Sequence, residues 1–261
     1  MSDYNLFFGV EHLHKISTSI SIAFDTETLQ LQPEIGKLRL IQLGCEVSKT
    51  IVIIDCFELD TDGWQKLRLF FTNGERYWLA HNAVFDLGWL QEHGIYVRGR
   101  VGCTMLASKL HHNGTPNLRH GLAHVAKRVL KIELDKEQQR SDWSVPVLSR
   151  DQLVYAAKDV EVLLQLDYPL TAALQTARLS EAYTLECRAL PAMAQMWRTG
   201  LPWNRNSLEQ LCNDYQHDIN ALGRDFLREL DNALPAEHKL PREAANTQRL
   251  SKLRDLVTQM G

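Results

Sequence analysis

The feature that most constrains the fold of this chain is a series of short apolar runs, rich in β-branched residues, at residues 20–24, 38–43 and 51–54. Polar or turn-forming residues bound each run, as is typical of strands that pair in one sheet. A fourth candidate strand, at residues 77–80, follows an amphipathic stretch, and helical patterns dominate after residue 84. Strands followed by interwoven helices predict an α/β fold, a mixed β-sheet flanked by helices.

The second half of the chain carries clear helix signals. Ser149, with Gln152 three residues later, matches a capping box, in which each side chain satisfies the backbone N–H of the other residue. We expect this helix to run to about Leu166 and Pro169 to mark its end. A second helical pattern, at residues 172–197, closes at a glycine and a proline.

The chain of 261 residues is long for one average domain and short for two, so we expect a main domain with an appendage. After about residue 175 the pattern is all-helical, and a further helix is expected from Asn206 with Glu209 as its capping partner. The predicted division is an α/β domain at residues 1–175 and a helical extension at residues 176–261.

Composition excludes several classes of protein. Hydrophobic residues make up 44% and charged residues 23%, which excludes a disordered chain. The net charge of −3 gives no general attraction to a polyanion, so any contact with nucleic acid must be local.

Five scattered cysteines without CxxC spacing are interpreted as reduced thiols. The sequence has no signal peptide and no transmembrane run, so we expect a cytoplasmic protein without a membrane partner.

Two carboxylates, Asp25 and Glu27, stand where the first apolar run ends, in the sequence FDTET. In extended backbone, residues i and i+2 point to the same side, so both carboxylates can reach one hard divalent cation. An isolated DxE at the end of a strand is more often a polar turn. The motif therefore needs support from elsewhere in the chain.

A second motif runs from His81 and Asn82 to Asp86, at the passage from a predicted strand into a helix. Aspartate is disfavoured in a helix interior, so Asp86 among apolar neighbours requires a hydrogen-bond partner or an ion. A lone aspartate of this kind is more often solvated on the surface.

The third motif pairs Tyr155 with Asp159 on the helix that begins after Ser149. A spacing of four places both side chains on one helical face, so a phenol and a carboxylate can reach the same site. On its own, this pair is more typical of an ordinary amphipathic helix with a buried tyrosine.

The order of the three motifs and the sequences around them support a single site. Together with QLQPEIGKLRLIQLG after the first motif and LDKEQQRSDW before the third, they resemble the DEDDy-type 3′-5′ exonuclease domain of family A DNA polymerases, with ribonuclease D as a close relative. The resemblance covers about residues 18–170. It implies a ribonuclease H-like fold and an active phosphodiester hydrolase.

The resemblance implies that Asp25, Glu27, Asp86 and Asp159 ligate two divalent metal ions, Mg²⁺ or Mn²⁺. Four converging carboxylates would repel one another without cations, and oxygen-only ligands suit these metals. Asp25, Glu27 and Asp159 would hold the ion that binds the nucleophilic water, and Asp25 and Asp86 the second ion. Tyr155 would orient the water.

The resemblance also supplies a substrate-binding set, which comprises Thr26, Thr28, Leu31, Gln42, His81, Asn82, Phe85, Gln139 and Ser141. Within it, Thr28 and Leu31 are expected to contact the terminal nucleotide. We interpret His81 as a hydrogen-bonding residue and not as a metal ligand. The segment at residues 136–142, which includes Lys136 and Asp142, is expected to support the backbone and the metal site.

The predicted function is hydrolysis of DNA, preferably at single-stranded or frayed 3′ ends, to nucleoside 5′-monophosphates, with proofreading as one possible role. An RNA-trimming enzyme of ribonuclease D type and a non-catalytic nucleic-acid- or polymerase-binding module stay open as alternatives. Residues 186–204 resemble the link to the polymerase region in family A enzymes. We therefore expect either a free-standing nuclease or a piece of a larger polymerase, with a polymerase domain in cis or in trans as a partner.

Overall fold

The computed structural model describes residues 4–134, 141–200, 202 and 204–233 of the chain. It divides into two compact units, Met1–Gly200 and Leu201–Gly261, which are described one by one. The first unit carries all the strands among the described residues.

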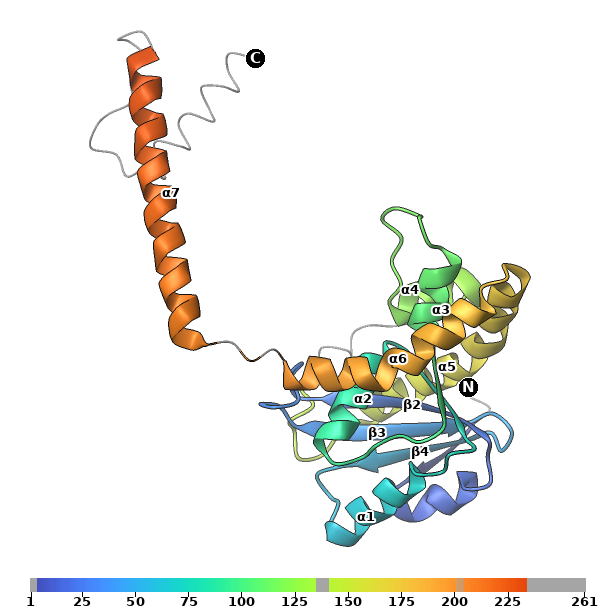
Figure 1. Cartoon of the computed structure of the whole chain (residues 1–261). Helices are drawn as coiled ribbons and strands as arrows, with labels where there is room; N and C mark the ends of the chain where they lie inside the picture. The colour runs from blue at the N-terminus through green and yellow to red at the C-terminus, as the bar shows by residue number, and fades with distance from the viewer. Residues whose placement is uncertain (1–3, 135–140, 201, 203, 234–261) are drawn as a thin grey trace. The chain divides into compact units, whose positions relative to one another are not determined.

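A six-stranded mixed sheet organises the first unit (Figure 1). Its order is β1-β4-β3-β2-β5-β6. The three central strands pair antiparallel, β2 with β3 and β3 with β4, whereas β1, β5 and β6 join in parallel. The strands are β1 (Asn5–Phe8), β2 (Ser21–Thr28), β3 (Leu38–Cys45), β4 (Thr50–Asp55), β5 (Tyr77–Ala80) and β6 (Arg100–Cys103).

The predicted α/β fold is confirmed, and each of the four predicted strands is present. The sequence did not predict β1 and β6, which have only four residues each. Runs this short carry little periodicity, and both strands owe their place to pairing with a neighbour, β4 and β5 respectively.

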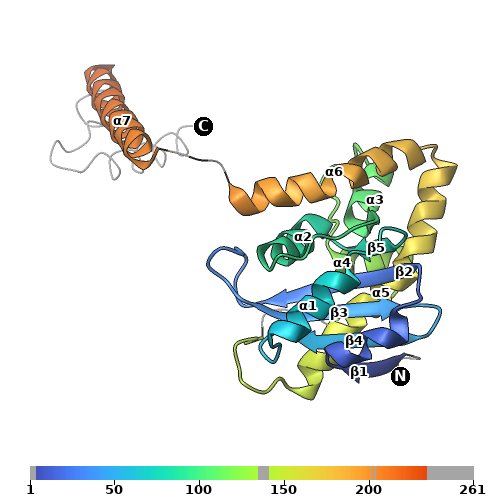
Figure 2. The same cartoon turned by 60° about the horizontal axis from the view of Figure 1, so that its bottom comes forward.

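Helices cover both faces of the sheet (Figure 2). One face packs on α1 (Thr61–Phe70), α2 (Ala83–Glu92) and the 3₁₀ helix η1 (Val10–Ile16), and the other packs on α5 (Arg150–Thr176). Along β2 the side chains alternate between these faces. Phe24 lies in the cluster with α1 and α2, whereas Ala23 contacts the apolar side chains of α5.

Three further helices complete the first unit, namely α3 (Thr104–His111), α4 (Leu122–Val129) and α6 (Ser180–Thr199). Helices α3 and α4 share a buried apolar cluster with the middle of α5. This cluster holds α3 and α4 against α5.

The predicted capping box at Ser149 is present, but the predicted end of its helix is wrong. Helix α5 continues through Pro169 to Thr176. Proline removes one backbone donor, yet Leu166, Leu170 and Leu174 stay on one buried face across it. Burial of these three leucines accounts for the continuity, at roughly 1.5–3 kcal/mol per fully buried side chain. The second helical pattern consequently starts at α6, and not at residue 172.

Helix α6 belongs to the first unit. It packs along α2, where Gly88 leaves room for the ring of Trp197, since a Cβ there would lie 2.6 Å from that ring. Gln91 Nε2 donates to the carbonyl of Pro191 at 3.0 Å across the same contact. The compact unit thus extends to Gly200, whereas the predicted division at residue 175 falls inside α5.

The second unit contains α7 (Arg205–Ala233) among its described residues. Its N-cap is Asn204, whose Oδ1 accepts from the backbone N–H of Ser207 at 3.1 Å. The predicted cap at Asn206 is therefore wrong, because an asparagine two residues earlier satisfies the free N–H group. None of the helices in the described part of the chain has the length and apolar character needed to cross a bilayer.

Candidate active site

The DxE motif lies at the carboxyl-terminal end of β2, and its two acids share one face of the sheet. Asp25 and Glu27 follow Ala23 in the alternation, so both point towards α5. There they meet Asp159. One carboxylate oxygen of each of the three residues lies within 4.8 Å of the others, which is close enough for all three to hold one metal ion.

Asp86 reaches the same place from the opposite face. Thr26, which points away from α5, donates its Oγ1 hydrogen to Asp86 Oδ1 at 2.6 Å. Asp86 stands in the first turn of α2 and is only 2% exposed. Asn82, the residue before α2, adopts the left-handed conformation (φ 61°), which asparagine tolerates well, and this sharp turn directs the helix start at the acids. The hydrogen-bond partner expected for Asp86 is thus a threonine of the DxE motif.

Tyr155 and Asp159 stand one turn apart on α5, as the spacing predicts. The Tyr155 hydroxyl is hydrogen bonded to the Asp159 carboxylate, and burial together with the nearby acids raises the pKa of this phenol. It stays protonated at neutral pH. Trp143 packs beside it, with the ring centroids 6.4 Å apart, and fixes the orientation of the phenol.

The electrostatics of the four acids are strongly unfavourable without a cation. Burial, followed by repulsion from the neighbouring carboxylates, raises the pKa of Asp25 and of Glu27 well above the ordinary range. Burial raises the pKa of Asp86 to about 7 and that of Asp159 to about 6. A divalent cation relieves this repulsion, and a ligand set made only of carboxylate oxygens suits a hard ion such as Mg²⁺ or Mn²⁺.

The acids open into a cleft of about 650 Å³. Most of the predicted substrate-binding residues line it, namely Thr26, Thr28, Leu31, His81, Asn82 and Phe85, together with Tyr155. Leu31 is exposed at the cleft edge, and the partly buried Phe85 packs on Trp197 of α6 with ring centroids 5.6 Å apart. The cleft therefore offers both a polar, acidic end and apolar surfaces.

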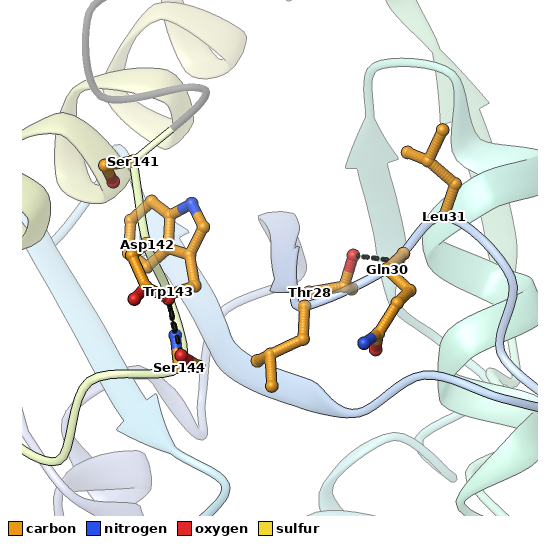
Figure 3. Close-up of a pocket in the computed structure, with 8 residues that line it drawn as sticks. Thr28, Gln30, Leu31, Ser141, Asp142, Trp143 and Ser144 are labelled. Atoms are coloured by element: carbon orange, nitrogen blue, oxygen red, sulfur yellow. Dashed lines mark hydrogen bonds between the residues drawn. The ribbon is translucent and has the colours of Figure 1, made fainter.

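Gln42 and Ser141 do not line this cleft. Gln42 pairs with Asp25 across β2 and β3, and as a residue of a central strand it is completely buried. Ser141 lines a neighbouring pocket of about 420 Å³, opposite Thr28 and Leu31 (Figure 3). Its Oγ accepts a hydrogen bond from Gln152 Nε2 at 3.0 Å. Lys136 and Gln139 lie outside the described residues.

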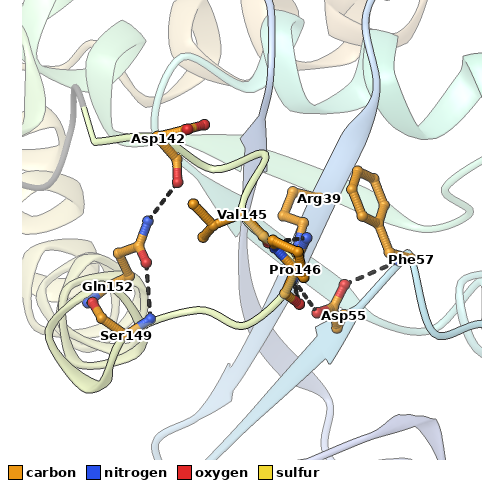
Figure 4. Close-up of polar contacts among 8 residues, drawn as sticks. All are labelled: Arg39, Asp55, Phe57, Asp142, Val145, Pro146, Ser149 and Gln152. Atoms are coloured by element: carbon orange, nitrogen blue, oxygen red, sulfur yellow. Dashed lines mark hydrogen bonds and ion pairs between the residues drawn. The ribbon is translucent and has the colours of Figure 1, made fainter.

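The segment before α5 is tied down by polar contacts (Figure 4). Buried Arg39 donates to the carbonyl of Val145 at 2.9 Å and forms an ion pair with Asp55 at 2.8 Å. Gln152 also donates to the carbonyl of Asp142. These contacts fix residues 142–152 on the sheet, and with them Trp143 and the start of α5.

One wall of the cleft is not predicted by the sequence. Arg119, His120 and His124, from the end of the loop after α3 and the first turn of α4, line the cleft together with the four acids. In the sequence, the basic and imidazole side chains of this segment follow no spacing that signals a site. The one weak signal is an arginine three residues before a helix start, followed directly by one histidine and five residues later by another.

His81 behaves as a hydrogen-bonding residue. Its Nδ1 lies 2.7 Å from Thr104 Oγ1, and burial lowers the pKa of the imidazole to about 4. His81 is therefore neutral at physiological pH, and the contact with Thr104 joins the end of β5 to the start of α3.

The sequence of this chain matches a known protein family. The family model described as 3′-5′ exonuclease matches residues 9–175. DNA polymerase I of Aquifex aeolicus is 36% identical over 169 residues, which is 63% of this chain and 26% of that protein. Ribonuclease D of Haemophilus influenzae is 32% identical over 175 residues, 66% of this chain and 41% of that protein. The chain thus spans less than half the length of these relatives.

Solved structures agree with the sequence relatives. The apo form of a nuclease superposes with a TM-score of 0.66 at 29% identity, covering 78% of this chain and all of that one. Brucella melitensis NrnC bound to pGG gives 0.64 at 26% identity, covering 76% of this chain and 95% of that one. The chain belongs to the 3′-5′ exonuclease family, and it is similar to DNA polymerase I and to ribonuclease D.

Proposed function

We propose that this nuclease is a two-metal exonuclease that removes nucleoside 5′-monophosphates from single-stranded 3′ ends of DNA. The observation that carries the proposal is the convergence of Asp25, Glu27 and Asp159 within 4.8 Å, with Asp86 held to the same motif through Thr26. A site of four acids at the end of one cleft fits phosphodiester hydrolysis at a chain end.

The acids fit a pair of hard divalent ions, because all four donors are carboxylates whose pKa values are raised in the absence of a cation. A related structure, Brucella melitensis NrnC, holds Mg²⁺. In the proposed arrangement Asp25, Glu27 and Asp159 hold one ion, and Asp25 and Asp86 hold the other. Bound ions of this kind stabilise the charge that develops on the attacking and leaving oxygens of an in-line displacement.

Tyr155 is proposed as a positioning residue. Its phenol is bonded to Asp159 and keeps its proton, so it serves as a hydrogen-bond partner that orients a water beside the carboxylates, and not as a base. Orientation of this kind lowers the activation free energy of hydrolysis, because water and phosphate are already aligned and less entropy is lost in the reaction.

The opposite wall is proposed to hold the strand. Arg119, His120 and His124 line the cleft together with the acids, and nitrogen donors of this kind suit the phosphate oxygens of the backbone. Leu31 and Phe85 offer apolar surfaces on which the terminal base can stack or lie. Neither wall carries a pattern that would read base sequence.

A direct assay tests the proposal. The chain is incubated with a labelled single-stranded DNA and with an RNA of the same sequence, in Mg²⁺, Mn²⁺ or EDTA. We expect metal-dependent release of mononucleotides from the 3′ end of the DNA, and none from the double variant Asp25→Ala, Asp159→Ala. Activity that survives this double substitution would place the site elsewhere.

Trimming of RNA is the second candidate function. It is supported by those relatives that are ribonucleases, such as ribonuclease D of Haemophilus influenzae, which is 32% identical over 66% of this chain. Cleavage of the RNA alone in the same assay would select this candidate over the first.

We further propose that residues 1–175 carry the complete exonuclease site and that residues 176–261 form a helical extension resembling the start of a polymerase region. Every described residue assigned above to metal or substrate lies before residue 175, although α6 supports Phe85 from beyond it. A polymerase domain, in cis or in trans, is the partner that this arrangement suggests.

A further inference from the structure

A chain of hydrogen bonds runs from α3 and α4 to the wall of the cleft. The two helices lie side by side and pack on α5 (Figure 1). Ser108 lies in the middle of α3, and Arg128 lies in the last turn of α4. Neither of them lines the cleft, whereas Arg119 and His120, in the loop just before α4, do. Both helix residues contact this loop.

Arg128 binds two partners through the two ends of its guanidinium group. Side chains of a helix lean towards its N-terminus, so Arg128 runs back along α4. Its Nη1 donates to the carbonyl of Arg119 at 3.2 Å, and its Nη2 donates to Ser108 Oγ at 2.6 Å. No carboxylate in the described part of the chain forms an ion pair with Arg128. The guanidinium group therefore holds the loop and Ser108, and not an acid.

Ser108 joins Arg128 to His120. Ser108 is completely buried, and its Oγ lies 2.9 Å from His120 Nδ1. Because Ser108 Oγ accepts from Arg128, its own hydrogen is free to donate, and Nδ1 is the acceptor within reach. Nδ1 is then the unprotonated ring nitrogen. The proton of the neutral imidazole is consequently on Nε2.

The second ring nitrogen of His120 is available to a ligand. Burial and the positive charge of Arg128 lower the pKa of His120, which favours the neutral imidazole. Among the residues that the structure describes, none forms a hydrogen bond with Nε2, and this atom is not buried. Because the ring lines the cleft, Nε2–H is a donor for a molecule bound there. A donor held in one orientation suits a phosphate oxygen.

We propose that Ser108 and Arg128 are positioning residues for the binding of the nucleic-acid strand. Ser108 fixes the tautomer and the orientation of His120, so that Nε2 donates to a phosphate oxygen of the strand. Arg128 holds Ser108 and the backbone of Arg119 in place. The inference rests on the proposed function, because it requires a strand in the cleft. Side chains oriented before binding lose less conformational entropy when the strand binds, so the arrangement acts on affinity and not on kcat.

The experiment measures the affinity of the full chain for a labelled single-stranded DNA and for an RNA of the same sequence, with Asp25→Ala present to prevent cleavage. His120→Ala should weaken binding about tenfold and Ser108→Ala about threefold, because a hydrogen bond to a charged group is lost or misaligned. Arg128→Gln should weaken binding more than Ser108→Ala does, because it also releases the backbone of Arg119. In a chain that carries His120→Ala, Ser108→Ala should have no further effect.

Two further measurements separate positioning from a merely structural role. The nitrogen chemical shifts of the His120 ring should show the Nε2–H tautomer in the unchanged chain and a mixture of tautomers in Ser108→Ala. In the chain that keeps Asp25, Ser108→Ala should raise KM and leave kcat nearly unchanged.

Lys127→Gln is the matched control, because Lys127 is the exposed neighbour of Arg128 on α4 and pairs with Glu133. It should change neither the affinity nor the tautomer. Equal affinity with and without Ser108→Ala would overturn the inference and leave the proposed function intact. Additive losses in the variant that combines Ser108→Ala with His120→Ala, or a fall in kcat at constant KM, would do the same. If the unchanged chain neither binds nor degrades either oligonucleotide, the proposed function fails and the inference with it.

Discussion

The two walls of the cleft are built in different ways. The acidic wall stands on the end of β2 and on the helices α2 and α5, and two of its acids, Asp86 and Asp159, are only 2% and 8% exposed. The opposite wall comes from a loop and the first turn of α4, and its Arg119 is exposed. Groups that must keep a fixed geometry lie on rigid, buried elements, whereas groups that grip a flexible strand lie on a loop.

The sharpest test of the acidic wall is Asp25→Ala, which we expect to have the largest effect. Asp25 serves both proposed ions, so its loss should lower kcat by about 10³-fold or more, with the fold intact. The measurement is single-turnover hydrolysis of a labelled oligonucleotide in Mg²⁺. Asp62→Ala, at an exposed position of α1, is the matched control and should leave the rate unchanged. A comparable loss in both variants would mean that the effect is not local.

Tyr155→Phe separates positioning from binding within the same wall. Because the phenol orients a water and does not hold substrate, its loss should lower kcat by about 10²-fold and leave KM nearly unchanged. Steady-state kinetics over a range of oligonucleotide concentrations provide the check. A rise in KM at constant kcat would instead assign Tyr155 to substrate binding.

The opposite wall should respond in the reverse sense. Arg119→Ala removes a charged contact to the strand, so we expect KM to rise about tenfold while kcat changes little. Raising the salt concentration should reduce the difference between the variant and the unchanged chain, because the contact is electrostatic. Arg119→Lys should restore part of the affinity. If kcat falls and KM does not change, Arg119 acts on the reaction and the two walls are less distinct than we propose.

The sequence predicts one wall much better than the other for a physical reason. Asp25 and Glu27 are two residues apart on a strand, and Tyr155 and Asp159 are four apart on a helix, so the spacing itself fixes a common face. Arg119 and His124 take their position from the path of a loop and from the packing of α4, and neither leaves a periodic signal. Loop geometry of this kind appears only in three dimensions.

Long-range pairing and burial account for the other differences. Gln42 follows the family pattern, but its place in a central strand buries it behind Asp25, where the sequence cannot show that it is out of reach of the cleft. Pro169 is a sound local signal for the end of a helix, and three buried leucines outweigh it. In each case tertiary packing prevails over a local preference.

Removal of metal should make the stability of the acidic wall depend on pH, and this is the smallest effect that we predict. Burial raises the pKa of Asp86 to about 7 and that of Asp159 to about 6, so the folded chain binds these protons more tightly than the unfolded chain does. The stabilisation is complete at a pH below the unfolded pKa of about 4 and is lost as the pH rises through 6 and 7.

In EDTA we therefore expect the Tm to fall by about 5 °C between pH 5 and pH 8, and Mg²⁺ to reverse the fall at pH 8. Differential scanning fluorimetry measures both changes. Asp86→Asn, which carries no charge at either pH, should reduce the fall, whereas Asp62→Asn should not. A Tm in EDTA that rises towards pH 8 would mean that burial does not oppose ionisation of these acids, and the argument for a divalent ion at this wall would fail.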